Sequence, residues 1–360
     1  MKLLLIDGNS VLFRAYYATS YGNIMKTSKG VYTNAIYAFA NMLNKAIRTI
    51  EPDYCAVAFD KGKHTFRHDI APDYKAGRKE TPEELAMQFP LVRDMLKAYN
   101  IPYLEYDTIE ADDIIGSLAK KYDMETCILS SDRDMLQLID DTTSVYVMRK
   151  GMSDIAKMDE AALKEEYGLK PYQIIDYKGL AGDKSDNIKG VEGVGDKTAV
   201  KLLNDYDTCE GIYEHIDEIK GKLQEKLIRD KDSCFLSKQL ATIKTDVAID
   251  KDLAELKLAI DNDGRNSFFV KAGSGSRDHF DRNGAGCPFR TGCPHRIASR
   301  RHAAGYRIIV FHDCSHDRFA VKIRQFINAL VFRFLKDFHP DLAFCHIGGD
   351  RNLLALFHCQ

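Results

Sequence analysis

Short apolar runs alternate with longer amphipathic stretches through the first half of the chain. Lys2–Ile6 and Tyr54–Phe59 are expected to be buried strands, and Asn34–Ile50 places its apolar side chains on one helical face. Further strands are predicted at Cys127–Leu129 and Val145–Met148. Strands that alternate with helices predict parallel βαβ units and therefore an α/β fold.

The pattern becomes helical after the predicted strand Val145–Met148. Helices are predicted at Asp159–Tyr167 and Pro171–Leu180, and the charged stretch Ile212–Lys244 is also expected to be helical. We therefore predict an α/β core over residues 1–170 and a helical region over residues 171–264.

Acidic residues follow the predicted strands. Asp7, Asp60 and Asp132 each come directly or closely after one, where Asp is also common in ordinary turns. Glu110–Asp113 precedes an apolar helical pattern, where carboxylates complement the helix dipole. Because the carboxyl ends of parallel strands meet at one edge of a sheet, we expect these acids to converge.

Converging carboxylates repel one another and need cations, and oxygen ligands favour hard ions such as Mg²⁺ or Mn²⁺. Asp134 lies two residues beyond Asp132, and Asp183 and Asp186 stand at a spacing that can share one metal. These acids are the further candidates for such a site.

The segment 61–93 is basic and contains aromatic residues. Lysines and arginines interleaved with Phe66 and Tyr74 suit a phosphate backbone and stacked bases, although a solvated loop has the same composition. Thr81 is predicted to cap a following helix, with Pro82 at its first position.

The glycine-rich stretch Gly190–Ala199 opens an apolar helix. Backbone N–H groups at such a point can cradle a phosphate, and Lys197 adds positive charge. The alternative is a tight connection between two helices. The spacing fits neither the dinucleotide fingerprint nor the P-loop.

Composition places the chain among soluble globular proteins. Of its 360 residues 45% are hydrophobic and 29% charged, and the net charge is −2. Neither a secretory signal nor a membrane span is evident, and the widely spaced cysteines before residue 265 indicate free thiols in a reducing cytoplasm.

Residues 265–360, here called the tail, differ in kind. The tail contains 15 of the 51 Lys and Arg residues, but only 7 of the 53 Asp and Glu residues and no Glu. This switch motivates the hypothesis that the tail is frameshifted or otherwise non-native, with a fold that the sequence leaves open. The alternative, a zinc module on Cys287, Cys293, His295 and His302, has a non-standard ligand spacing.

The order of the motifs is specific as a set. It runs LLLIDGNS, AVAFD, YKAGR, EADD, SDRD, GDKSDN and GVEGVGDKTA. This set resembles the 5′-nuclease domain at the front of bacterial DNA polymerase I, in the flap endonuclease superfamily, from Met1 to about residue 250. The resemblance implies a PIN-like parallel-sheet nuclease core with a helical arch at about 61–93, then a helix–three-turn–helix region that grips duplex DNA.

The resemblance also implies roles for individual residues. The first of two Mg²⁺ or Mn²⁺ sites matches Asp7, Asp60, Glu110 and Asp112, and the second matches Asp132, Asp134, Asp183 and Asp186, with Asp113 nearby. Lys75 and Arg78 match arch residues at the scissile phosphate, and Arg67 and Tyr74 are expected to contact DNA. The loop with Gly190, Gly193, Val194, Gly195, Lys197 and Thr198 matches a duplex-binding element that often holds K⁺.

The implied protein is a monomeric, cytoplasmic, nucleoid-associated enzyme. Its expected activity is 5′→3′ exonuclease and flap endonuclease cleavage of DNA with a 5′ flap, nick or 5′ end, and of RNA primer, in replication and repair. No polymerase-like pattern follows the match.

Four alternatives stay open. The first is a binding module that has lost catalysis, against which the presence of all nine acids argues. The second is a module weakened by the tail. A haloacid dehalogenase phosphatase would need Asp where Asn9 stands, and a PIN-type ribonuclease would not need the arch and glycine-rich motifs.

Overall fold

The computed structural model describes residues 1–21, 24–27, 29–149, 155–261, 268, 299–301 and 307–309. The chain divides into two units, Met1–Arg277 and Asp278–Gln360. In the second unit, the described residues form an antiparallel pair, β9 (Ser299–Arg301) and β10 (Arg307–Ile309). The frameshift and zinc hypotheses for the tail otherwise lie outside the described residues.

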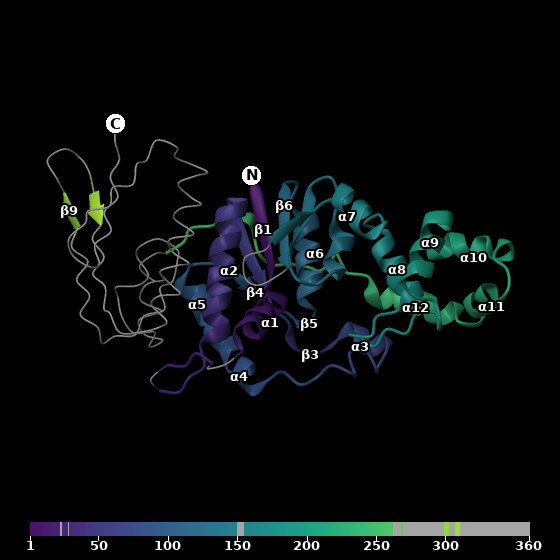
Figure 1. Cartoon of the computed structure of the whole chain (residues 1–360), viewed down its shortest axis with the longest axis horizontal. Helices are drawn as coiled ribbons and strands as arrows, with labels where there is room; N and C mark the ends of the chain where they lie inside the picture. Colours follow the sequence, from purple (N-terminus) through teal and green to yellow (C-terminus); the bar gives the residue numbers. More distant parts are fainter. Residues whose placement is uncertain are drawn as a thin grey trace, which may run out of the picture. The chain divides into compact units, whose positions relative to one another are not determined.

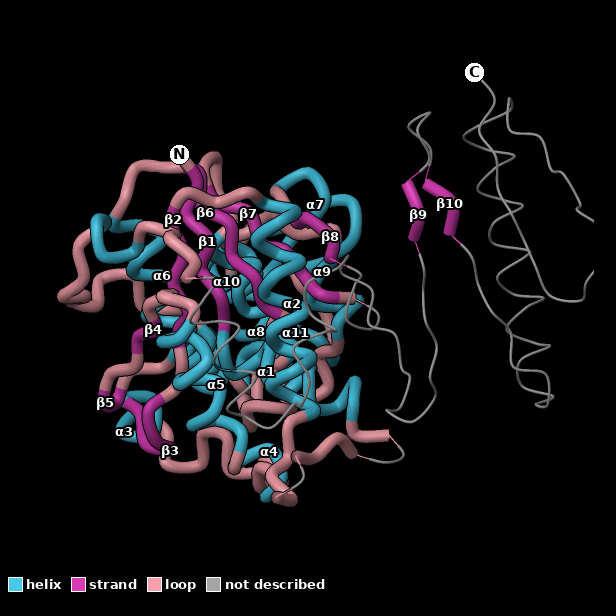
Figure 2. Tube along the Cα trace, turned by 90° about the vertical axis from the view of Figure 1, so that its left-hand side faces the viewer, coloured by secondary structure: helices cyan, strands magenta, loops and turns pink. Residues whose placement is uncertain are grey.

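A mostly parallel sheet forms the centre of the first unit (Figures 1 and 2). Its strand order is β4-β2-β1-β6-β7-β8, and only β8 runs antiparallel to its neighbour. The strands are β1 (Lys2–Asp7), β2 (Tyr54–Ala58), β4 (Tyr103–Leu104), β6 (Glu125–Ser130), β7 (Thr143–Met148) and β8 (Ile155–Met158). The predicted α/β fold is confirmed.

Both faces of the sheet are covered, which explains the continuous apolar runs of its strands. Leu4 and Ile6 pack beneath α1 (Gly8–Thr19), α2 (Asn34–Ile50) and α5 (Gln88–Ala98). Leu3 and Leu5 pack on the other face, beneath α6 (Ala111–Lys121) and the 3₁₀ helix η1 (Asp134–Leu138). Full burial of each leucine stabilises the fold by about 1.5–3 kcal/mol.

The predicted arch segment is only partly helical. It contains β3 (Lys61–Thr65), which pairs with β5 (Asp107–Thr108), and the short helices α3 (Phe66–Ile70) and α4 (Glu83–Ala86). Pro82 occupies the cap position of α4, so the prediction that Thr81 is the cap was one residue early.

The helical region continues the core of the sheet. Buried residues such as Leu180, Leu203 and Leu227 belong to the same apolar cluster as Leu3 and Leu5. α7 (Glu160–Tyr167) precedes this region. The helices within it are α8 (Gln173–Ala181), α9 (Asp196–Tyr206), α10 (Cys209–Glu214), α11 (Lys222–Arg229) and α12 (Lys231–Ala241), with the 3₁₀ helices η2 (Ile216–Glu218) and η3 (Leu253–Leu256). The single helical stretch predicted over 212–244 is broken, because Gly221 adopts φ +72° before α11. Among the described residues, no helix is long and apolar enough to span a membrane.

Gly190 is predicted to be intolerant of a side chain. Its φ is +64°, and a Cβ atom there would stand 2.4 Å from the Gly182 backbone nitrogen and 2.7 Å from the Leu180 carbonyl oxygen. Neither backbone atom can move away without distorting the chain around it. Gly190→Ala should therefore lower the free energy of unfolding by about 2–4 kcal/mol in urea denaturation. Gly77→Ala is the control, since nothing lies within 4 Å of its Cβ position. Equal stability of the two variants would contradict this account.

Candidate functional site

Three acids lie at the carboxyl edge of neighbouring strands. Asp7 ends β1, Asp60 follows β2 by two residues and Asp132 follows β6 by two residues. β1 lies between β2 and β6. The chain adds β2 and β4 on one side of β1 and then crosses to add β6 on the other side. Such a switch point leaves a crevice outside the carboxyl ends of the strands, where ligands of open α/β sheets bind.

Other elements bring further acids to this edge. Glu110 is the N-cap of α6, and Asp112 lies in the first turn of that helix. Asp134 opens η1. Asp183 and Asp186 lie in the loop between α8 and α9, which is closed by two hydrogen bonds of 2.8 Å between Asp183 and Ile188.

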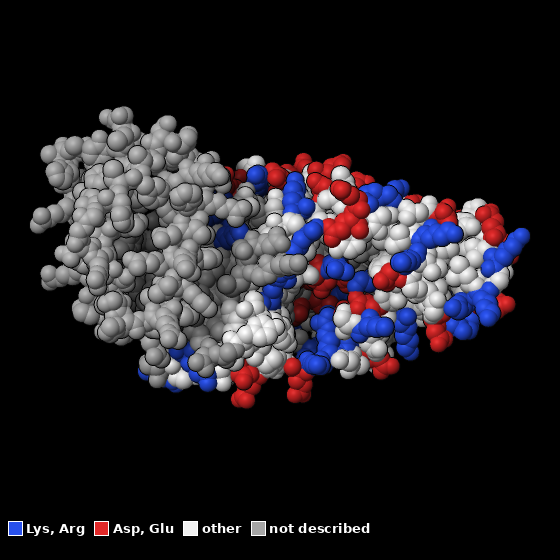
Figure 3. Space-filling model, viewed as in Figure 1, with Lys and Arg blue, Asp and Glu red and all other residues white. Residues whose placement is uncertain are grey.

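Electrostatic repulsion links the acids to one another. The charges of Asp7, Asp132 and Asp60 disfavour the ionised form of Asp112, and those of Asp132 and Asp186 disfavour the ionised form of Asp134. On the face shown in Figure 3, Asp and Glu atoms gather in the middle, between Lys and Arg atoms. The structure thus brings together the two predicted sets of carboxylates.

Neutral donors hold the carboxylates of the first set. Ser130 Oγ donates to Asp7 Oδ2 at 2.8 Å, and Asn9 Nδ2 donates to Asp60 Oδ2 at 2.8 Å. The backbone N–H of Ala111 donates to Asp60 Oδ1 at 2.8 Å. Sequence reasoning missed Ser130 and Asn9, although each lies within three residues of a predicted acid.

Two basic residues of the arch segment, Lys75 and Arg78, pair with acids of the group. Lys75 Nζ donates to Glu110 Oε2 at 2.8 Å, and the Arg78 guanidinium pairs with Asp186. The backbone N–H of Lys75 also donates to the Asp186 carbonyl at 2.9 Å, with Lys75 itself at φ +58°. The turn therefore aims both cations at the carboxylates.

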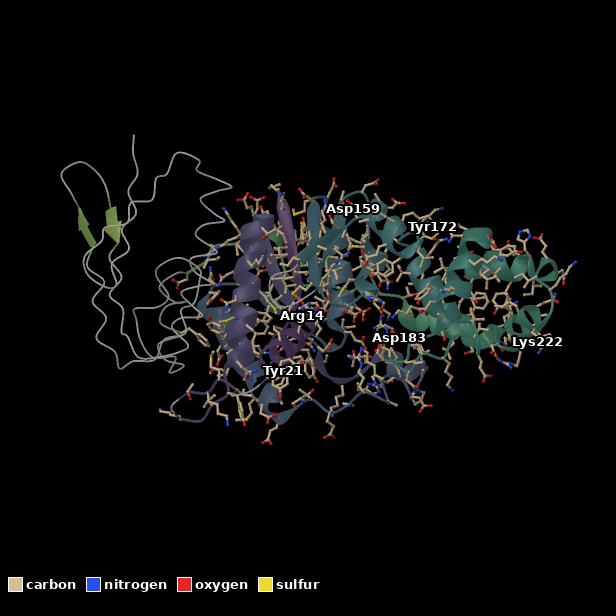
Figure 4. All side chains as sticks on the ribbon, viewed as in Figure 1. Arg14, Tyr21, Asp159, Tyr172, Asp183 and Lys222 are labelled. Atoms are coloured by element: carbon tan, nitrogen blue, oxygen red, sulfur yellow. The ribbon has the colours of Figure 1, made fainter. Side chains whose placement is uncertain are left out.

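A third cation, Lys178, was not predicted. Its Nζ lies 2.6 Å from Asp134 Oδ1 and also pairs with Asp183 Oδ2. Lys178 lies in the last turn of α8, five residues before Asp183. Figure 4 shows Asp183 where α8 meets the core, distant from Lys222 at the far end of the helical region.

Burial and mutual repulsion shift the pKa values of the acids. Burial raises the pKa of Asp7 to about 7, against the hydrogen bonds from Ser10 and Ser130 and with help from Asp132 and Asp60. Burial and the charge of Asp132 likewise raise the pKa of Asp134 to about 6.

Asp112 and Glu110 are shifted in opposite directions. Burial, followed by repulsion from Asp7 and Asp132, raises the pKa of Asp112 well above its ordinary value. Burial also acts to raise the pKa of Glu110, but the charges of Lys75 and Arg67 overcome it and lower that pKa.

The chemistry of these side chains fits divalent cations. All of the candidate ligands are carboxylates, which hard ions prefer, and Asp112 accepts no hydrogen bond from any described residue. In the described part of the chain, no three His, Cys, Asp or Glu side chains form a ready ligand cluster. Lys75, Arg78 and Lys178 lie among the carboxylates instead.

Arg67 and Asp113 correct the prediction. Arg67 is only 2% exposed, and its two terminal nitrogens donate to the Asp113 carboxylate at 2.8 and 2.9 Å. Its Nε donates to the Leu240 carbonyl at 2.8 Å. The prediction that Arg67 contacts DNA is therefore wrong, and Asp113 is committed to this ion pair rather than to a metal. The pair joins α3, α6 and the end of α12.

Tyr74 also differs from its predicted role. It is 5% exposed and packs with Ile188 and Leu240, so it offers no face to DNA. Its hydroxyl lies 3.3 Å from Asp186 Oδ2 and 3.4 Å from Glu110 Oε2. The Tyr74 hydroxyl thus lies within hydrogen-bonding distance of one carboxylate of each set.

The glycine-rich loop is divided between interior and surface. Gly190 and Val194 are buried, which contradicts a direct contact of either with DNA. Gly195 caps α9, and the Gly193 carbonyl accepts a hydrogen bond of 3.2 Å from Lys226 Nζ. The predicted residues of this loop that reach the surface are Gly193, Gly195, Lys197 and, partly, Thr198, and the acids Glu192 and Asp196 are exposed beside them.

Comparison with known families accounts for most of the chain. Residues 2–168 match the 5′-3′ exonuclease N-terminal resolvase-like domain, and residues 169–263 match the 5′-3′ exonuclease C-terminal SAM fold. The chain belongs to the 5′-3′ exonuclease family. The predicted resemblance and the predicted nuclease class are confirmed.

Relatives of this exonuclease family member include DNA polymerases I. The chain is 48% identical over 259 residues to that of Bacillus caldotenax, covering 71% of this chain and 29% of the relative. It is also 48% identical over 260 residues to that of Bacillus subtilis strain 168, again covering 71% and 29%. The chain therefore spans less than a third of the length of these relatives.

Solved structures share the fold of this family member. T5 5′-exonuclease with bound zinc matches with a TM-score of 0.55 at 22% identity, covering 76% of this chain and 98% of that one. The T5 flap endonuclease in complex with DNA and metal ions matches with a TM-score of 0.53 at 22% identity, covering 67% and 89%. The catalytic core of Rad2 with a DNA substrate matches with a TM-score of 0.50 at 15% identity, covering 75% and 86%.

The Arg67–Asp113 pair generates a prediction about stability. Arg67→Ala should lower the free energy of unfolding by about 3–5 kcal/mol, because it leaves the Asp113 carboxylate charged and buried. Lys61→Ala, which removes an exposed ion pair with Asp107, should cause little change. Urea denaturation of both variants tests this. A stable Arg67→Ala variant with weakened DNA binding would restore the original interpretation.

Asp7 generates a prediction about pH. Its pKa is about 7 in the folded chain and near 3.8 when unfolded, so between these pH values the folded state binds the extra proton. The contribution of Asp7 to stability without metal should therefore fall as pH rises from 4 to 7 and stay low above pH 7. Asp7→Asn should raise the free energy of unfolding at pH 8 by about 1–3 kcal/mol and change little at pH 4.

Urea denaturation in EDTA at several pH values measures this effect. Asp217→Asn is the control, since Asp217 is an exposed acid of η2. A lower free energy of unfolding for Asp7→Asn than for the wild type at pH 8 would show that the charged Asp7 carboxylate does not destabilise the folded state.

Proposed function

We propose that the chain is a divalent-metal-dependent, structure-specific 5′ nuclease. It hydrolyses phosphodiester bonds at the 5′ ends and flaps of DNA, and of RNA primers, in replication and repair. The observation that carries the proposal is the convergence of carboxylates from β1, β2, α6, β6 and the α8–α9 loop at one edge of the sheet. Its membership of the exonuclease family supports the same chemistry.

Two divalent cations, Mg²⁺ or Mn²⁺, are proposed as cofactors. When bound, such ions supply Lewis-acid chemistry at water and at the scissile phosphate. The first set would hold one ion, with Asp112 as its least compensated carboxylate. The second set would hold the other through Asp132, Asp134, Asp183 and Asp186.

The arch cations are proposed to act on the substrate. Lys75 and Arg78 lie at the carboxylate group and carry the positive charge needed to bind and orient a phosphodiester. Charge that grows on the phosphate in the transition state would be stabilised by the same two residues. Their present partners, Glu110 and Asp186, position them there.

The partner proposed for the helical region is duplex DNA adjoining the cleaved end. The exposed first turn of α9 presents backbone N–H groups, with Lys197 beside them. Lys226 on α11 adds positive charge beside this loop, since its Nζ lies 3.2 Å from the Gly193 carbonyl oxygen. A K⁺ ion in the 190–198 loop and a monomeric enzyme belong to the same proposal.

Asp112→Ala provides the sharpest test of catalysis. Loss of this carboxylate should lower metal-dependent cleavage of a 5′-flap substrate by at least about 100-fold, because electrostatic groups of this kind are worth several kcal/mol. DNA binding should stay within a few-fold of the wild type, measured by fluorescence anisotropy in Ca²⁺ or EDTA.

Asp217→Ala serves as the matched control, since it removes an exposed acid from η2. Cleavage by Asp112→Ala at the wild-type rate would overturn the site assignment. An inactive wild-type chain that still binds the flap would favour a binding module.

A further inference from the structure

Lys178 bridges two carboxylates of the second set. Its Nζ lies 2.6 Å from Asp134 Oδ1 and pairs with Asp183 Oδ2, and its side chain is only 12% exposed. The ammonium group therefore stands between the two acids at a depth that water reaches poorly. No other cation pairs directly with Asp134 or Asp183 in the described part of the chain.

The local fold fixes this position. Lys178 lies in the last turn of α8, where a positive charge also complements the helix dipole. α8 packs against η1, which begins at Asp134, and Asp183 stands two residues beyond the end of α8. The other Asp183 oxygen accepts from the Ser185 N–H at 2.7 Å.

The two sets of carboxylates are compensated differently. In the first set, Asp7 and Asp60 accept hydrogen bonds from neutral donors, and Glu110 pairs with Lys75 and Arg67. Asp112 has no cation paired with it among the described residues. In the second set, Lys178 supplies a full positive charge to two acids. A cation entering the second set meets a protein ammonium already in contact with its ligands.

We propose that Lys178 is a resident counter-ion that competes with the second divalent cation for Asp134 and Asp183. This inference rests on the proposed function, because it presupposes that the second set binds a metal. Lys178 stabilises the metal-free site and weakens metal binding there. The second set therefore binds its divalent cation more weakly than the first set binds its own.

The competition has a clear physical basis. An ammonium and a divalent cation cannot both occupy the space between Asp134 and Asp183 without strong repulsion at short range. Binding of the metal must therefore move the Lys178 side chain, whose four-carbon stem allows it. Because this displacement costs free energy, it lowers the net affinity of the second set for the metal. Removal of the Lys178 ammonium group in a variant would raise that affinity.

The experiment measures Mn²⁺ binding to the full-length chain without DNA, by isothermal titration calorimetry, together with thermal unfolding in EDTA and in Mn²⁺. Lys178→Met should bind the weaker of two Mn²⁺ ions at least about ten-fold more tightly, and Lys178→Arg should stay within about three-fold of the wild type. Lys178→Met should melt below the wild type in EDTA but not in saturating Mn²⁺.

Lys238→Met is the matched control. Lys238 also bridges two acids, Asp176 and Glu210, each at 2.6 Å, with 18% of its side chain exposed, but outside the carboxylate group. Its removal should lower the melting temperature with and without Mn²⁺ and leave Mn²⁺ affinity unchanged. If Lys178→Met does not fold, Lys178→Gln takes its place in the same measurements.

The outcomes separate the two proposals. Two Mn²⁺ ions bound by the wild type, with unchanged or weaker affinity in Lys178→Met and Lys178→Gln, would overturn the role of Lys178 alone. A second ion that binds only after Lys178 is removed would support it. No Mn²⁺ binding by any variant would overturn both this inference and the proposed metal-dependent function.

Discussion

Repulsion among buried and partly buried carboxylates is the constraint on which the rest of this structure depends. Asp7, Asp112 and Asp134 would each be protonated more readily here than in water, because burial and neighbouring charges disfavour their ionised forms. The fold tolerates them because opposing groups are built in at fixed points. Neutral donors hold Asp7 and Asp60, whereas Lys75 pairs with Glu110, Arg78 with Asp186, and Lys178 with Asp134 and Asp183.

Much of this arrangement could be predicted from the sequence. Continuous apolar runs mark strands covered on both faces, and parallel topology sends the residues after them to one edge. Asp7, Asp60 and Asp132 were placed correctly by that argument alone. Their placement needed no side-chain geometry, only strand direction and the position of each acid after its strand.

What could not be predicted concerns burial and partner choice. Arg67 and Tyr74 stand in a basic, aromatic segment that resembles a nucleic-acid surface, yet both side chains turn inward. Asp113 differs from Asp112 by one position, and a helical step of about 100° turns it from the site toward Arg67. The pairing of Lys178 with Asp134 could not be predicted, because it depends on the packing of α8 against η1, two segments that are distant in sequence.

The apolar cluster that runs from the sheet into α8–α12 makes the two family segments inseparable. A fragment ending near residue 168 would expose the apolar side chains that α8 covers and would lose Asp183 and Asp186 at once. Unfolding is accordingly expected to be cooperative across residue 169, and proteolysis at that boundary should not release a stable piece. The boundary between the two family segments is therefore not a boundary between independently folding parts of this chain.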